Sequence, residues 1–126
     1  MFNPFKKTYK LVTHNGKYHA DDIFACAILQ LVLDKEGKQY KVIRTRDKEI
    51  IEKGDYVFDI GGIDDSNILR FDHHQKGGAG ARENGIPYAA CGLVWREYGA
   101  FLSGSVNVAK RVEQKLIQQI DADDNG

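Results

Sequence analysis

Residues 9–35 read YKLVTHNGKYHADDIFACAILQLVLDK, and this stretch sets the class of fold. The first five of these residues alternate and include β-branched side chains, which indicates a strand over 9–13. Asn15-Gly16 is a turn signal. The segment from Ala20 to about Lys35 is apolar on nearly every side, which predicts a buried helix. The sequence therefore contains a strand, a turn and a buried helix in succession.

The alternation of strand and helix continues along the chain. We expect strands over 40–45, 56–60 and 67–72, a short helix over 47–53 closed by Gly54, and final helices over 90–102 and 105–120. Asp64 and Asp65 are expected in a loop. Residues 75–87 hold four glycines and no apolar period, so we expect a mobile loop there. This order predicts an α/β fold, doubly wound, with a mainly parallel sheet and helices on both faces.

Length and composition limit the classes of protein. The 126 residues fit a single domain with one core. The 18 lysines and arginines balance 18 aspartates and glutamates, which excludes the overall basic charge of a protein that coats nucleic acid. Cys26 and Cys91 lie in apolar helical patterns, so we expect reduced core thiols and a cytoplasmic location. Apolar runs are shorter than the roughly 20 residues that cross a bilayer, and no membrane role is indicated.

All four histidines lie in two short segments that also carry carboxylates. Most of the candidate site residues follow predicted strands or begin a helix, and such positions meet at the carboxyl edge of an open α/β sheet. Asp121 would reach that edge through a short strand or turn after the last helix. Carboxylates and neutral imidazoles together suit two divalent transition metals. The candidates are His14, His19, Asp21, Asp59, Asp72, His73, His74 and Asp121.

Some of these residues also have ordinary structural explanations. A single histidine at a strand end, such as His14, is more often a hydrogen-bonding residue than a metal ligand. Asp59 lies in an apolar strand, where a carboxylate is costly unless it is paired or bound to metal. Its structural alternative is to cap the Gly61-Gly62 turn.

Other residues near the candidates are expected to be structural. Asp22 fits the first turn of a helix, where the macrodipole favours negative charge. Asp123 and Asp124 are expected to be solvated or turn-forming, with Asp123 as an alternative supporting partner for a ligand. Trp95, Tyr98 and Phe101 recur at a helical spacing. This spacing is more typical of core positions than of a base-stacking platform.

Five segments of the chain carry a resemblance to a known family. They are THNGxxHxD at 13–21, RTRD at 44–47, DIGG at 59–62, RFDHHQ at 70–75 and IDAxDNG at 120–126. Together they resemble the melanocyte proliferating gene product family, a branch of the DHH phosphoesterase superfamily. The resemblance implies that residues 1–126 form a single metal-binding catalytic domain like the N-terminal domain of DHH phosphoesterases, without the second domain that members usually have. It also implies a two-manganese site and exonuclease action on RNA.

The resemblance also implies a role for each candidate. One metal ion would be held by His14, His19 and Asp59, and the other by Asp21, Asp59, His73 and Asp121, with Asp59 bridging. His74 would contact the substrate phosphate, and Asp72 would orient the histidines. Because adjacent residues that leave a strand point to opposite sides, we expect His73 and His74 not to ligate the same ion.

Four basic residues are candidate clamps for substrate phosphate: Lys76, Arg82, Arg44 and Arg46. A guanidinium offers a planar fork that matches phosphate oxygens. The alternative for Arg44 and Arg46 is a solvated strand end.

These observations favour a metal-dependent phosphodiester hydrolase with two divalent ions, Mn²⁺ as first choice, acting on RNA or oligonucleotides. A second hypothesis keeps the metals and takes a small substrate such as pyrophosphate, a dinucleotide or a nucleoside phosphate. A third is a metal-binding domain without turnover. A homo-oligomer is compatible with each of them.

Overall fold

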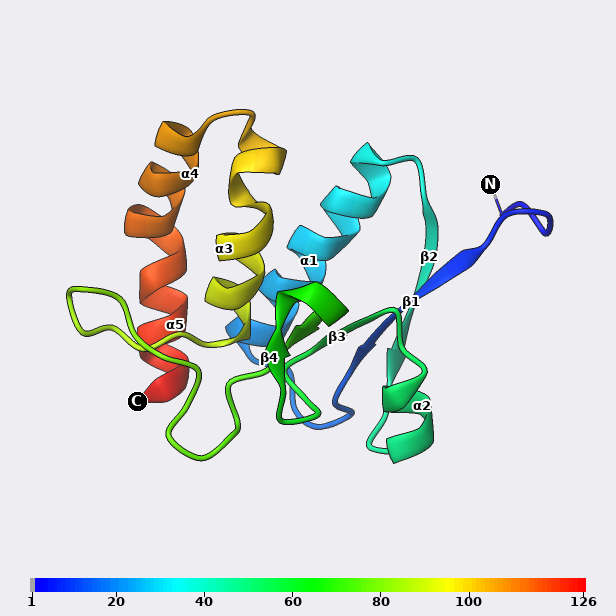
Figure 1. The fold of residues 1–126 in the computed structure, drawn as a ribbon, viewed down its shortest axis with the longest axis horizontal. Coiled ribbons are helices and arrows are strands. Elements are labelled where there is room, and N and C mark those ends of the chain that lie inside the picture. The colour runs from blue at the N-terminus through cyan, green and yellow to red at the C-terminus, as the bar shows by residue number, and fades with distance from the viewer. Residues whose placement is uncertain (1) are drawn as a thin grey trace.

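The computed structural model describes residues 2–126, which form one five-stranded sheet flanked by helices (Figure 1). The strands are β1 (Thr8–Thr13), β2 (Gln39–Arg44), β3 (Tyr56–Phe58), β4 (Asp64–Asp65) and β5 (Arg70–Phe71), in the order β2-β1-β3-β5-β4. The first four strands in this order are parallel, and β4 is antiparallel to β5. The helices are α1 (Ala20–Lys35), α2 (Lys48–Glu52), α3 (Ala90–Ser103), α4 (Val106–Val112) and α5 (Gln118–Asn125). The predicted α/β class is confirmed.

The two faces of the sheet carry different helices. The connections β1-α1-β2 and β2-α2-β3 move in opposite directions across the sheet, so right-handed crossovers place α1 and α2 on opposite faces. Leu11 and Phe58 belong to the core cluster beneath α1 and α3. On the other face, a Cβ added at Gly54 after α2 would lie 2.8 Å from both Val12 and Val57. The glycine therefore allows the end of α2 to pack closely on these valines.

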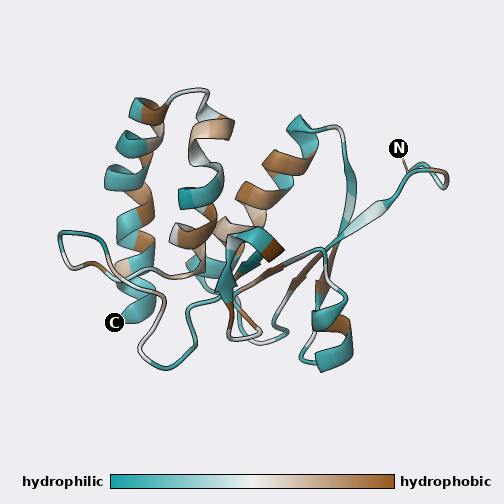
Figure 2. Cartoon of the chain, viewed as in Figure 1, coloured by the Kyte–Doolittle hydropathy of each residue, from teal (hydrophilic) through white to brown (hydrophobic). Residues whose placement is uncertain are grey.

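Helix α1 has the predicted bounds and forms the centre of the core. Leu29, Val32 and Leu33 are fully buried, whereas Ile23 and Leu31 are exposed. The prediction of a helix buried nearly all round is therefore wrong for this outer stripe. Figure 2 shows hydrophobic residues along the carboxyl half of β1 and on β3, and hydrophilic residues along the outer side of α4 and α5.

The segment between β3 and the histidines differs from the prediction. β3 ends at Phe58, because Asp59 adopts a left-handed conformation with a φ of 57°. Asp64–Asp65, expected in a loop, pairs with β5. The expected strand over 67–72 is divided: Ser66–Ile68 form a 3₁₀ turn, and only Arg70–Phe71 are extended. The turn begins where the side chain of Asp65 accepts the N–H of Asn67.

The final helical segment is longer than predicted. α4 continues through a π-helical turn over Glu113–Ile117 into α5, which ends at Asn125. No glycine or proline interrupts residues 105–125, so the backbone has no strong signal to end the helix at 120. Asp121, predicted to follow the last helix, therefore lies within α5. No helix among residues 2–126 is long and apolar enough to cross a membrane.

Residues 75–87 form a long connection before α3, in which Ala81 and Pro87 make an isolated antiparallel pairing (Figure 1). The mobility of residues 75–87 stays a prediction. Cys26 and Cys91 are free thiols, and Cys91 is fully buried. The expectation of reduced core cysteines agrees with these positions.

Candidate metal centre

The candidate residues gather at the carboxyl edge of the parallel strands. β1 lies between β2 and β3, and the connections on its two sides diverge, which leaves a crevice at this point of an open α/β sheet. A cavity of about 910 Å³ opens there. Its lining includes His14 after β1, Asp59 after β3, and His73 and His74 after β5, together with Asp124 from α5.

Asp59 occupies the centre of this group and is buried. Its Oδ2 lies 3.2 Å from Nε2 of His14, and its Oδ1 lies 3.2 Å from Nε2 of His73. Each oxygen therefore faces a different imidazole, which is the arrangement that a bridging carboxylate requires. The left-handed backbone of a non-glycine residue costs about 1 kcal/mol or more, and such strain is concentrated at functional sites. The N–H of Asp59 donates to the carbonyl oxygen of Phe71, which holds it in register with β5.

His14 faces a second carboxylate as well. Its Nε2 lies 3.1 Å from Oδ2 of Asp22, and the same oxygen accepts the N–H of His19 at 2.9 Å. The expectation that Asp22 serves only the first turn of α1 is therefore incomplete. The N–H of Gly16 donates to Nδ1 of His14. A metal at Nε2 would place the ring proton on Nδ1, so this contact would have to open. His19 itself is largely exposed, with Nδ1 3.9 Å from Asp22.

His73 connects β5 with the end of α5. Its Nε2 lies 3.1 Å from Oδ2 of Asp124 and 3.6 Å from Oδ2 of Asp21, and its Nδ1 lies 3.2 Å from Oδ1 of Asn125. Burial would lower the pKa of His73, but hydrogen bonds to Asp124 and Asp59 outweigh burial and raise it to about 10. The bond to His73 lowers the pKa of Asp124 in turn. The expectation that Asp124 is merely solvated or turn-forming is wrong.

Asp21 is buried between His73 and the beginning of α3. Its two oxygens accept the N–H groups of Cys91 at 2.7 Å and Ala90 at 3.2 Å, which are unpaired donors of the first helical turn. Burial and the nearby charge of Asp59 raise the pKa of Asp21 to about 8. A positive ion beside this carboxylate would relieve both effects.

Asp121 contacts protein groups in this structure, and its role as a metal ligand stays a prediction. It accepts the N–H of Gly92 at 3.0 Å and Nη2 of Arg82 at 2.7 Å. A Cβ at Gly92 would lie 1.8 Å from the Asp121 carboxylate, so glycine is required there. Arg82 also pairs with Glu113, and its side chain is 7% exposed. In this structure Arg82 is therefore not available to clamp a phosphate.

Asp72 and His74 form a pair at the mouth of the cavity. Oδ1 of Asp72 lies 2.7 Å from Nδ1 of His74, and its Oδ2 accepts the N–H of Gly62 at 2.6 Å. The Gly61-Gly62 turn is therefore tied by Asp72, and the alternative of a cap by Asp59 is wrong. The rings of His73 and His74 lie 4.2 Å apart. The expectation that they point to opposite sides is also wrong, because the chain after Phe71 is no longer an extended strand.

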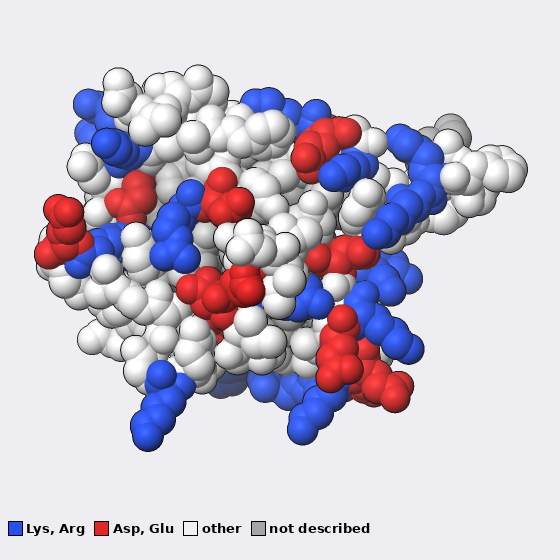
Figure 3. Space-filling view, viewed as in Figure 1, with Lys and Arg blue, Asp and Glu red and all other residues white. Residues whose placement is uncertain are grey.

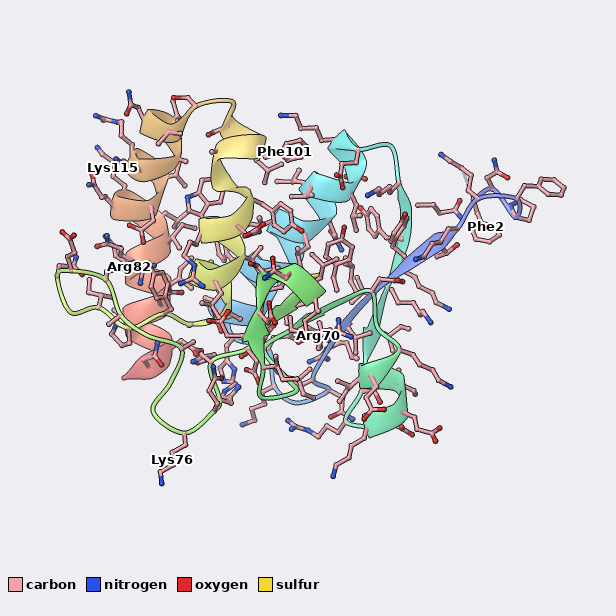
Figure 4. All side chains as sticks on the ribbon, in the orientation of Figure 1. Phe2, Arg70, Lys76, Arg82, Phe101 and Lys115 are labelled. Carbon is pink, nitrogen blue, oxygen red and sulfur yellow. The ribbon has the colours of Figure 1, made fainter. Side chains whose placement is uncertain are left out.

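The other basic candidates occupy different environments. Arg46 lines the cavity, and its Nε donates to Oδ1 of Asn15. Arg44 donates to the carbonyl oxygen of Gly16 at 2.5 Å, so the alternative of a solvated strand end is wrong for Arg44. Lys76 projects from the fold into solvent (Figure 4). Figure 3 shows other lysine and arginine side chains along the same lower margin of the molecule, where the loops after the strands lie in Figure 1.

The donor set fits divalent cations. Buried carboxylates are costly unless a cation or hydrogen bonds compensate them, and this region buries several. The buried ones are Asp21, Asp22, Asp59, Asp72 and Asp121. Within the described residues, four groups of three or more ligand side chains have donor atoms within 4.8 Å of one another. Oxygen and imidazole nitrogen ligands together favour transition metals over magnesium or calcium.

Comparison with known proteins identifies the family of this chain. Residues 10–126 match the model of the family described as "Uncharacterised protein family (UPF0160)", the MYG1 exonuclease family. The chain is 35% identical to the MYG1 protein of Dictyostelium discoideum, over 92% of this chain and 38% of that protein. It is 29% identical to the MYG1 exonuclease of Homo sapiens, over 93% of this chain and 35% of that protein.

The chain thus spans little more than a third of the length of the curated relatives that it matches. No solved structure matches it. The family match extends from within β1 through the end of α5 and includes every residue of the candidate metal centre. The chain belongs to the MYG1 family.

Proposed function

We propose that this domain hydrolyses phosphodiester bonds with two divalent metal ions, Mn²⁺ as first choice, and acts as an exonuclease on RNA or short oligonucleotides. The observation that carries the proposal is the position of Asp59, whose two oxygens face the imidazoles of His14 and His73 in a carboxylate-lined cavity. The human relative is named as an exonuclease, which supports the reaction class.

The geometry favours two changes to the ligand set that the resemblance implies: Asp22 is added to the first group, and Asp124 replaces Asp121 in the second. One ion would be held by His14 and Asp59, with His19 and Asp22 beside them. The other would be held by Asp21, Asp59, His73 and Asp124. Asp124 replaces Asp121 in this proposal because it lines the cavity and lies 3.1 Å from His73, whereas Asp121 is engaged by Arg82.

Metal ions bound there would supply Lewis-acid charge and lower the pKa of bound water toward neutrality. His74 is 58% exposed and uses Nδ1 for the contact with Asp72. When both ring nitrogens carry a proton, Nε2 would donate a hydrogen bond to a phosphate oxygen, where a fixed donor stabilises charge that develops in the transition state. Arg46 and Lys17 line the same cavity and bring positive charge to the substrate.

A second candidate function is hydrolysis of a small phosphate compound such as pyrophosphate, a dinucleotide or a nucleoside phosphate. The cavity volume of about 910 Å³ supports it, because small-molecule sites commonly enclose roughly 300 to 1,000 Å³. The neutral net charge of the chain also gives no general attraction for a long polyanion.

The test is hydrolysis of a substrate panel in Mn²⁺: 5′- and 3′-labelled RNA and DNA oligonucleotides, a dinucleotide and pyrophosphate. We expect the wild-type chain to release nucleoside monophosphates from RNA and the variant Asp59→Asn to lose this activity. Asparagine tolerates the left-handed backbone at this position, so the variant should keep the fold. Asp64→Asn, on the edge strand β4 and outside the cavity lining, serves as the matched control. Release of phosphate from small compounds alone would favour the second function. Mn²⁺ binding without hydrolysis of any substrate would indicate a non-catalytic metal-binding domain.

A further inference from the structure

Tyr18 is an exposed aromatic residue in the loop between β1 and α1. The residue is 65% exposed, and its neighbours Lys17 and His19 both line the cavity. The guanidinium carbon of Arg44 lies 3.9 Å from the centroid of the Tyr18 ring. One side of the ring therefore rests on a planar cation, while much of the residue remains open to solvent beside the metal centre.

The support beneath the ring is itself fixed. Arg44 ends β2 in register with Thr13 of β1, and its Nη2 donates to the carbonyl oxygen of Gly16 at 2.5 Å. The same loop is held a second time by Arg46, whose Nε donates to Asn15. The aromatic ring is thus ordered before any ligand arrives, which reduces the entropy that binding costs.

The surroundings of Tyr18 carry charge that suits a phosphodiester. Lys17 and Arg46 line the cavity together with the metal-ligating candidates, so positive groups lie beside the candidate metal centre. A nucleic acid strand alternates phosphates with planar bases. Proteins that bind single strands combine a positive groove with aromatic platforms in this way.

Other aromatic residues within the described part of the chain are less suitable as platforms. Trp95 and Tyr98 pack against the core, and the indole N–H of Trp95 donates to the carbonyl oxygen of Ala109. Phe101 is exposed, but it lies near the far end of α3 from the cavity, as Figure 4 shows. The ring of Tyr88 lies between the guanidinium groups of Arg82 and Arg96. Tyr18 combines exposure with a position beside the metal centre.

We propose that Tyr18, supported by Arg44, is a stacking platform for a nucleobase of the substrate, and that Lys17 and Arg46 bind the phosphates next to that base. This inference rests on the proposed function and narrows its substrate class to phosphodiesters that carry bases, in preference to pyrophosphate. Stacking of one base on an aromatic ring changes affinity by about 5- to 150-fold.

The experiment measures binding without turnover. Isothermal titration calorimetry would compare an unlabelled tetranucleotide with hydrolysis-resistant phosphorothioate linkages and its twin that carries abasic sugars. We expect the wild-type chain to bind the base-bearing strand about 5- to 150-fold more tightly. Tyr18→Ala should bring this ratio close to one, and Tyr18→Phe should keep it. Phe5→Ala is the matched control, because Phe5 is 96% exposed and lies before β1, at the opposite end of that strand from the cavity.

Equal affinity of the wild-type chain for both strands, or an unchanged ratio in Tyr18→Ala, would overturn the inference. If Tyr18→Ala leaves the ratio unchanged but changes the molar mass of the protein measured by light scattering, Tyr18 lies in a contact between protein chains. That result would also overturn the inference. Because the ratio is measured without hydrolysis, failure of the proposed function would appear separately, in the substrate panel.

Discussion

Among the single residues of the candidate site, Asp59, His73 and His74 differ in burial and in their contacts. Asp59 is buried and faces His14 with one oxygen and His73 with the other. His73 is buried, whereas His74 is exposed at the cavity mouth and tied to Asp72. Burial favours a ligand role for His73, and exposure favours a substrate role for His74, even though their rings are neighbours.

We therefore predict different losses for the two histidine variants. His73→Ala should lower Mn²⁺ affinity far more than His74→Ala, because it removes the imidazole that lies between Asp59 and Asp124. His74→Ala should retain the metals and lose hydrolysis on the order of 10²-fold, as expected for a preorganised donor. Calorimetry with Mn²⁺ and turnover of labelled RNA measure the two effects. The opposite order of metal loss would exchange the two assignments.

The histidines and Asp59 are recognisable from the sequence as candidate site residues, whereas Asp22 and Asp124 are not. A carboxylate in an apolar strand is a strong signal, since it must be compensated. Asp22 and Asp124 carried no such signal, because each stands in a run of acidic residues at a helix end. Which member of such a run faces the interior depends on helix phase and length, and the length of α5 was underestimated.

At the scale of elements, the loop over 75–87 is anchored through one buried side chain. Arg82 pairs with Asp121 of α5 and with Glu113, and its guanidinium carbon lies 4.3 Å from the centroid of the Tyr88 ring. The N–H of Arg82 also donates to the carbonyl oxygen of Ile86. The loop is therefore fixed at its second half, and the glycines at 77 and 78 lie in the half without this anchor.

We predict that Arg82→Met lowers the free energy of unfolding by about 3 kcal/mol, because it leaves the fully buried Asp121 without its charged partner. The double variant Arg82→Met with Asp121→Asn should be more stable than Arg82→Met alone, since the second change removes the unpaired charge. Urea unfolding measures both. Hydrogen exchange should accelerate over 80–88 in Arg82→Met. Unchanged exchange there would show that other contacts hold the loop.

Asp55 joins the turn after α2 to β1 and gives a pH-dependent contribution. Its Oδ2 accepts the N–H of Lys10 at 2.8 Å, and its Oδ1 lies 3.0 Å from Nζ of Lys7. Burial would raise the pKa of Asp55, but these hydrogen bonds outweigh burial and lower it. A folded-state pKa below the unfolded value of about 3.9 means that the charged form stabilises the fold. This stabilising contribution is fully present at pH values above about 3.9, the unfolded-state pKa, and is lost as the pH falls through the folded-state pKa.

We therefore predict that Asp55→Asn lowers the free energy of unfolding by about 1 kcal/mol at pH 7. The difference between the wild-type chain and the variant should shrink as the pH falls below about 4 and disappear once the folded-state carboxyl is protonated. Urea unfolding at a series of pH values measures this. A difference that stays constant down to pH 2 would mean that the carboxylate charge contributes nothing.

The long helices and strands were predictable from the sequence, whereas the connection from β3 to the histidines was not. The bounds of α1 match because the apolar segment from Ala20 and the acidic first turn at Asp21 and Asp22 indicate the same helix. The strand before the histidines was misjudged because Leu69 has a φ of 58°, which its sequence does not signal. That left-handed residue ends the 3₁₀ turn and shortens β5 to two residues.

In the molecule as a whole, the candidate site combines residues from the strands of the sheet with a residue from the final helix, α5. β1, β3 and β5 bring His14, Asp59 and His73 to one edge, and the last turn of α5 brings Asp124 to the same place. Several of these groups are carboxylates, so they repel one another without a cation. Metal binding should therefore stabilise the entire fold, and the end of α5 should be required for this effect.

We predict that Mn²⁺ at about 100 times its dissociation constant raises the midpoint of thermal unfolding by roughly 10 °C, because a ligand of the folded state at that concentration adds about 2.7 kcal/mol. Asp124→Asn should lose most of this shift, and Asp64→Asn, on the edge strand β4 and outside the cavity lining, should keep it. Differential scanning calorimetry with and without a chelator measures both. If Asp121→Asn removes the shift while Asp124→Asn retains it, the ion is held by Asp121, and the contact with Arg82 must open when the ion binds.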